Sequence, residues 1–116
     1  MVTIKLSTFT TEAASKAKGT ILKTMLVEAL GTGEKIVVDF SGIKRFASPF
    51  FNNSFATLGL IYGFDLLDKI ERINITSTGD NTYETSVENA KLIYQNPEFS
   101  SEIDEIINNV PKKVEY

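Results

Sequence analysis

Ile36-Val37-Val38-Asp39-Phe40-Ser41-Gly42-Ile43 is the stretch that decides the fold, and it continues to Phe46-Ala47-Ser48-Pro49-Phe50-Phe51. Its β-branched apolar residues predict a buried strand, the Ser41-Gly42 pair predicts a turn, and Ser48-Pro49 predicts the start of a helix. A strand, a loop and a helix in this order place the Ser48 hydroxyl near the carboxyl end of a central strand. Open α/β sheets usually carry their binding sites at that edge.

Strands and helices alternate on both sides of this stretch. Period-two patterns predict strands at 2–6 and 70–76, and the second should point Ile73 and Ile75 inward. The strand at 35–40 is almost entirely apolar, which predicts a central position covered on both faces. Only three strands are clear, so the sheet needs helices on at least one face. The sequence therefore predicts an α/β fold in which a small sheet packs against helices.

Helical spacing predicts three helices. The first follows caps at 9–12 and ends at Gly31-Thr32-Gly33 with a left-handed glycine, and Gly19 within it indicates close packing against a neighbour. The second runs from about 49 to 62 and ends at Gly63, and the third begins between 82 and 85 and ends before Pro97. Residues 64–69 form either a connection or one extra helical turn. In the first helix Ala14, Ala17, Ile21, Met25 and Ala29 are expected to face inward, and Leu22, Leu26 and Leu30 widen this apolar face. The inward residues of the other two are expected to be Phe51, Phe55, Leu58 and Tyr62, then Val87, Ala90, Ile93 and Tyr94.

The chain of 116 residues has room for one domain and not for two. Residues 1–97 carry the α/β pattern. Residues 98–116 are interpreted as an amphipathic C-terminal helix and tail of the same domain, with apolar residues from Phe99 to Val110 at helical spacing.

Composition excludes several classes of function. The net charge is −3, so no basic field favours nucleic acid or an anionic membrane. The chain has no cysteine and no histidine, which excludes thiolate zinc sites, thiol chemistry and Ser–His–Asp hydrolysis within it. No apolar run reaches the roughly 18 residues of a membrane-spanning helix, and no signal-peptide pattern opens the chain. We expect a cytoplasmic protein without a cofactor or a bound metal.

Ser48 is the first candidate site residue, and it has two compatible interpretations. Serine followed by proline is a common helix N-cap, so Ser48 can have a purely structural role. A phosphate on Ser48 would also lie against free backbone amides and the positive end of the helix. Lys44 and Arg45 add positive charge just before it, and Phe50 adds an aromatic ring just after it.

Carboxylates elsewhere have plainer interpretations. Asp39, at the end of the central strand, is expected to accept hydrogen bonds from backbone amides of the following turn. Asp65, Asp68 and Glu71 have no metal-ligand spacing and are expected to be solvated.

Three segments carry a family resemblance. Val38-Asp39-Phe40-Ser41-Gly42-Ile43, Phe46-Ala47-Ser48-Pro49-Phe50 and Asn89-Ala90-Lys91-Leu92-Ile93-Tyr94 resemble the STAS-like domain family of unknown function. The resemblance covers residues 1–97 and is strongest over 36–58. It implies a STAS-like sheet packed against helices.

The resemblance also implies a kind of partner. Broader relatives, the anti-sigma factor antagonists, bind a serine kinase of the histidine-kinase-like ATPase type. They carry a phosphorylated serine at the start of the second helix, within an Asp-Ser-Ser/Thr-Gly segment. Ser48 matches that serine, whereas Ala47, Pro49 and Phe50 replace the acid, the second hydroxyl residue and the glycine. These departures affect the expected phosphorylation switch and leave the expected fold unchanged.

Three hypotheses follow for function. The first is a non-enzymatic regulatory domain that docks a protein partner, with a histidine-kinase-like ATPase as the candidate, through Lys44, Arg45, Ser48 and Phe50. The second is a structural module that associates with itself, as a homodimer for example, without a phosphorylation switch. An enzyme is the third, and no motif assembles a nucleophile with a base or a metal set to favour it.

Overall fold

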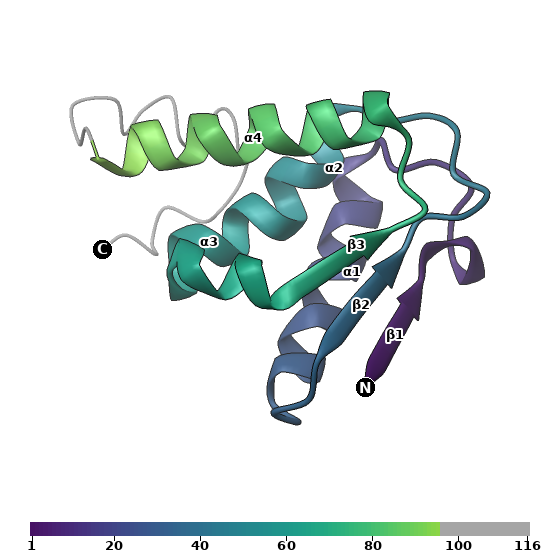
Figure 1. The fold of residues 1–116 in the computed structure, drawn as a ribbon. Helices are drawn as coiled ribbons and strands as arrows, with labels where there is room; N and C mark the ends of the chain where they lie inside the picture. Colours follow the sequence, from purple (N-terminus) through teal and green to yellow (C-terminus); the bar gives the residue numbers. More distant parts are fainter. Residues whose placement is uncertain (96–116) are drawn as a thin grey trace.

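A computed structural model describes residues 1–95 of the chain, and it confirms the α/β fold (Figure 1). Three parallel strands form one sheet in the order β1 (Val2–Lys5), β2 (Ile36–Asp39), β3 (Ile70–Ile73). The apolar strand is therefore central, as the sequence predicts. Ile36 pairs with Val2 on one side and with Ile70 on the other.

The hydrophobic core lies on one face of the sheet. The strand residues that belong to it are Ile4, Ile36, Val38 and Ile70. Val37 lies on the opposite face, outside this core, between the exposed residues Thr3 and Glu71. Its side chain is only 5% exposed. All three apolar residues of β2 are therefore buried, as predicted for a strand covered on both faces.

The first helix, α1 (Lys16–Leu30), begins later than its predicted caps at 9–12. The Ser15 hydroxyl accepts a hydrogen bond from the Lys18 amide at 3.1 Å and so caps the helix. Only one side of the predicted apolar face is buried, the side that carries the predicted leucines. Leu22, Leu26 and Ala29 are buried, whereas Ala17 and Ile21 are exposed.

The glycines within this helix and at its end test two predictions, close packing at Gly19 and a left-handed glycine at the helix end. A Cβ at Gly19 would collide with the Phe50 carbonyl oxygen, which confirms the predicted close packing. Gly31, the C-cap, has a right-handed φ of −67°, so the predicted left-handed cap is wrong at that position. The left-handed residue is Gly33, with φ of +74°.

The second helix spans residues 48–62, as predicted, but it contains a π-helical turn. It consists of α2 (Ser48–Phe51), the π-helical η2 (Asn52–Ala56) and α3 (Thr57–Tyr62). A π-turn adds one residue to a helical turn and so shifts the spacing of the face beyond it. Phe51, Phe55 and Leu58 are buried, as predicted, whereas Tyr62 is 57% exposed.

Polar side chains connect the π-turn to its surroundings. The Thr57 hydroxyl donates to the Asn52 carbonyl oxygen at 2.6 Å, and the Ser86 hydroxyl donates to the Asn52 side-chain oxygen at 2.5 Å. These bonds satisfy polar groups that would otherwise be costly to bury.

Gly63, with φ of +102°, ends this helix as predicted. The short 3-10 helix η3 (Phe64–Lys69) then leads into β3, which matches the alternative of one extra helical turn. A similar 3-10 turn, η1 (Leu6–Thr8), follows β1.

The β3 strand faces the core differently from the prediction. Ile70 and Arg72 share the face of their β2 partners Ile36 and Val38, so Ile73 points to the opposite face. Ile75 does pack against the core, as predicted, from beyond the end of the strand.

The last described helix, α4 (Ser77–Gln95), begins earlier than the predicted start at 82–85. Residues 77–81, which precede the predicted start, make up its first turn. The Thr76 hydroxyl accepts a hydrogen bond from the Gly79 amide at 3.1 Å and supplies the cap. Val87, Ala90 and Ile93 are buried as predicted. Tyr94 is 62% exposed, so its predicted inward position is wrong.

Two further predictions concern a C-terminal helix and membrane-spanning segments. The predicted amphipathic helix at 98–116 lies outside the described residues. Among residues 1–95, no helix is long and apolar enough to cross a membrane.

The core is aromatic where the second helix meets the sheet and α4. The Phe51 ring lies 6.1 Å from the Phe40 ring, 6.2 Å from the Phe55 ring and 5.9 Å from the Tyr83 ring, measured between centroids. Each of these three phenylalanines is 0% exposed. The second helix is thus held between the central strand and α4.

Replacing Phe55 by alanine should therefore destabilise the fold strongly. We expect Phe55→Ala to lower the free energy of unfolding by about 3–5 kcal/mol, because the enclosed ring leaves a cavity. Ile21→Ala, at an exposed position of α1, is the control and should change it by less than about 1 kcal/mol. Denaturant titration of both variants measures the difference, and a loss below about 1 kcal/mol for Phe55→Ala would contradict this core.

Candidate functional site

The loop between β2 and α2 carries the candidate site residues. It begins with a turn in which the Ile43 amide donates to the Phe40 carbonyl oxygen at 3.0 Å, and Gly42 adopts φ of +84°. This left-handed conformation favours glycine. Ile43 is buried and anchors the loop, whereas Lys44 and Arg45 are exposed.

Two backbone hydrogen bonds tie this loop to the segment before α1. The Ala13 amide donates to the Arg45 carbonyl oxygen at 2.9 Å, and the Ala47 amide donates to the Ala13 carbonyl oxygen at 3.0 Å. Ala13 itself is 0% exposed. The loop is therefore held on both sides of Phe46 by one residue from a distant part of the chain.

The Phe46 side chain packs over the first turn of α4. A Cβ at Gly79 would come within 2.6 Å of the Phe46 ring, so only glycine fits beneath it. The Phe46 and Phe51 rings are nearly parallel, with centroids 6.4 Å apart. The loop thus has contacts with both α4 and the second helix.

Ser48 is the first residue of α2, and its side chain does not cap the helix. Ala47 is the N-cap, and it makes no side-chain hydrogen bond. The predicted capping role of Ser48 is therefore wrong. Within residues 1–95, the Ser48 hydroxyl makes no hydrogen bond, and the residue is exposed. The hydroxyl is thus available to solvent.

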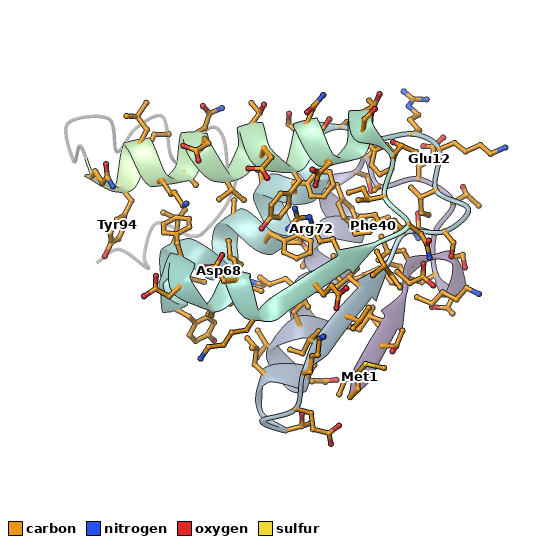
Figure 2. The ribbon with its side chains drawn as sticks, viewed as in Figure 1. Met1, Glu12, Phe40, Asp68, Arg72 and Tyr94 are labelled. Atoms are coloured by element: carbon orange, nitrogen blue, oxygen red, sulfur yellow. The ribbon has the colours of Figure 1, made fainter. Side chains whose placement is uncertain are left out.

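Charges near Ser48 are mostly unpaired. The Arg45 guanidinium lies 3.9 Å from the Glu12 carboxylate, and both side chains are at least half exposed. Such an exposed pair contributes little to stability. Lys44 forms no ion pair within the described part of the chain. Figure 2 shows Glu12 at the end of the molecule to which the strands point.

Phe50 needs a correction. The sequence suggested that its ring contacts a partner, but Phe50 is 0% exposed and stacks edge-on against Phe51 with centroids 5.2 Å apart. We therefore leave Phe50 out of the candidate surface. From here on, the Ser48 surface means Lys44, Arg45 and Ser48.

Asp39 is the polar anchor at the carboxyl end of β2. One carboxylate oxygen accepts from the Ser41 amide at 2.9 Å and from the Ser41 hydroxyl at 2.7 Å, which confirms the predicted turn. The same oxygen accepts from the Asn74 side-chain amide at 3.0 Å. These hydrogen bonds, that from Asn74 first, lower the pKa of Asp39 below its ordinary value of 3.8.

Two features of the structure were not predicted from the sequence. The first is the left-handed conformation of Asn74, with φ of +57°. The sequence did carry a signal for it, because asparagine adopts this conformation more readily than most residues. The second is Arg72, whose guanidinium donates to the Asp80 carboxylate at 2.8 Å and lies over the Tyr83 ring. Burial raises the pKa of the Tyr83 hydroxyl above 10.0. An arginine at a strand position gives no signal for such contacts.

The described residues offer no metal centre. Within residues 1–95, no group of three or more aspartates or glutamates is arranged to hold an ion. The Ser48 surface offers an exposed hydroxyl and, three and four residues earlier on the same loop, two exposed cationic side chains. Backbone hydrogen bonds fix this loop.

Comparison with known proteins gives one match. A family model described as a STAS-like domain of unknown function matches residues 19–80, which is more than half of the chain. This range includes β2, the Ser48 surface and β3. Neither a search of curated proteins nor a search of solved structures gave a match.

Removing the Asn74 side chain should raise the pKa of Asp39. Asn74→Gly is the suitable variant, because glycine keeps the left-handed backbone. A lowered folded-state pKa contributes stability above pH 3.8 that is lost as the pH falls through the folded value, and this contribution should shrink in the variant. An NMR titration of the Asp39 carboxyl measures the shift, with Asn81→Gly as a control in α4. An unchanged Asp39 pKa would show that Asn74 does not hold the carboxylate.

Proposed function

The chain belongs to the family of STAS-like domains, and from that membership we propose that it is a regulatory protein-interaction domain that docks a partner through the Ser48 surface. Domains of this kind are generally non-enzymatic. The candidate partner is a histidine-kinase-like ATPase, the class that the broader relatives bind, and the expected compartment is the cytoplasm.

The observation that carries this proposal is the exposed Ser48 hydroxyl on a fixed loop. A serine that neither caps its helix nor bonds elsewhere in residues 1–95 is free to contact a partner or to accept a phosphate. The backbone bonds through Ala13 hold the loop, so little order would have to be gained on binding.

Charge indicates the chemistry of the partner. Lys44 and Arg45 are exposed on the same loop as Ser48, and the one ion pair of Arg45 among residues 1–95 is a long, solvated contact with Glu12. An acidic surface on the partner would be attracted to these cations. Phosphorylation of Ser48 would add negative charge beside them and so regulate the same contact. Position 47 lacks the acid that anti-sigma factor antagonists carry before their serine, which is compatible with docking that does not require the phosphate.

Self-association is the second candidate function, and a different surface favours it. Ile61 and Tyr62 at the end of α3 are 50% and 57% exposed, and Tyr94 in α4 is 62% exposed. Apolar side chains of this size in one region are typical of contact surfaces. Light scattering of the full chain tests it: a concentration-dependent dimer that Tyr62→Ser weakens supports self-association, and a monomer at all concentrations excludes it.

Photo-crosslinking tests the docking proposal most directly. A photoreactive residue at position 44 should capture the partner in cells, and the same residue at position 69, on exposed η3, should not. The captured protein is identified and purified for binding measurements.

The affinities of variants then identify the surface. Lys44→Glu should weaken binding about fivefold, because one favourable charge contact becomes repulsive. Ser48→Asp should change the affinity, and Lys69→Glu, the matched control, should not. Because the Ser48 hydroxyl makes no hydrogen bond to the described part of the chain, the melting temperature should stay the same in Ser48→Asp. Equal affinity of all three variants and the wild type would discard the Ser48 surface.

A further inference from the structure

A second candidate site lies between η3, β3 and α4. These elements line an open pocket of about 330 Å³, and the apolar residues Leu67, Ile70 and Val87 are part of its lining. The cavity shares no residue with the Ser48 surface. Figure 2 shows Arg72 between β3 and α4 and Asp68 on the η3 side.

Two cationic side chains of the chain itself lie on aromatic rings of this cavity. The Arg72 guanidinium carbon is 3.5 Å from the centre of the Tyr83 ring. The Lys91 ammonium nitrogen is 5.9 Å from the centre of the Phe64 ring. Aromatic faces attract cations through their quadrupole, and the attraction grows when water is partly excluded. The cavity therefore already holds positive charge against its walls.

The two cations are held very differently. Arg72 also donates to the Asp80 carboxylate at 2.8 Å, and its side chain is only 19% exposed, so its position is fixed. Lys91 forms no ion pair within residues 1–95, and its distance to Phe64 is close to the limit of about 6 Å for such contacts. Lys91 is thus a loosely held cation that an external one can replace.

Negative charge exceeds positive charge around the cavity. Its carboxylates are Asp68, Glu71, Glu84 and Glu88, against the two cations Arg72 and Lys91. Glu71 pairs with Lys35 at 3.1 Å, and Glu84 lies 3.8 Å from Arg72. Asp68 and Glu88 form no ion pair with any described residue. These two carboxylates, one on η3 and one on α4, can accept hydrogen bonds from a further cation.

We propose that this cavity binds a primary alkylammonium group, with its carbon chain against Leu67 and Val87 and its charge near Asp68 and Glu88. The Phe64 ring, now facing Lys91, would face the bound ammonium instead. An anion is disfavoured by the carboxylates, and a neutral alcohol would gain only the apolar contact. A free amine and the lysine side chain of a partner protein share this chemistry.

Three small molecules of equal length test the charge requirement. The full chain is titrated with n-butylamine, n-butanol and butyrate while its backbone amide signals are followed by NMR. n-Butylamine should shift the signals of residues 64–71 and 83–91 in a saturable way, and the other two should bind at least about threefold more weakly. Equal shifts with all three compounds, or shifts by n-butylamine confined to other residues, would overturn the proposal.

Two charge variants should change the affinity for n-butylamine in opposite directions. Glu88→Gln should weaken n-butylamine binding about threefold, and Lys91→Gln should strengthen it by a similar factor, because the competing cation is removed. Glu28→Gln, at an exposed position of α1, is the matched control and should leave the affinity unchanged. Melting temperatures confirm that each variant is folded. An affinity that does not respond to either cavity variant would also overturn the proposal.

A lysine derivative distinguishes the two sources of the amine. Nα-acetyl-lysine amide carries the side chain without free termini. Tighter binding of this compound than of n-butylamine supports recognition of a protein lysine, and the reverse order supports a free amine. No binding of either compound contradicts the site and leaves the proposal for the Ser48 surface unaffected.

Discussion

Two backbone hydrogen bonds through Ala13 connect parts of the chain that lie far apart in sequence. They join the segment before α1 to the loop after β2, and they fix the chain on both sides of Phe46. Because the Phe46 ring can then pack over Gly79, the start of α4 is fixed as well. One buried residue thus connects the beginnings of three helices at the carboxyl edge of the sheet.

The aromatic core and the exposed site both depend on this arrangement. The second helix begins directly after the fixed loop, so its first turn approaches α1 where Gly19 leaves room for the Phe50 carbonyl group. Phe50 and Phe51 then point into the core and are 0% exposed, while Ser48 remains exposed. The same placement that buries two phenylalanines therefore leaves the serine, like Lys44 and Arg45, exposed to solvent.

Local patterns in the sequence predicted the parts of this fold that depend on neighbours in the chain. The apolar run at 36–39 is the central strand, and Gly63 ends the second helix with a positive φ. Features set by distant contacts were missed. Ile73 points away from the core because β2 dictates the register of β3, and the Ser48 cap was wrong because Ala13 sets the path of the loop. The contacts of Arg72 with α4 likewise have no local signal.

Hydrogen exchange of the Ala47 amide tests the fixed loop most directly. The central claim is that the chain before Ser48 is held in place in the absence of a partner. The Ala47 amide donates to the Ala13 carbonyl oxygen at 3.0 Å and should therefore exchange slowly, with protection similar to that of amides in β2. Exchange of the Ala47 amide at the rate of an unstructured peptide, while β2 stays protected, would contradict the account.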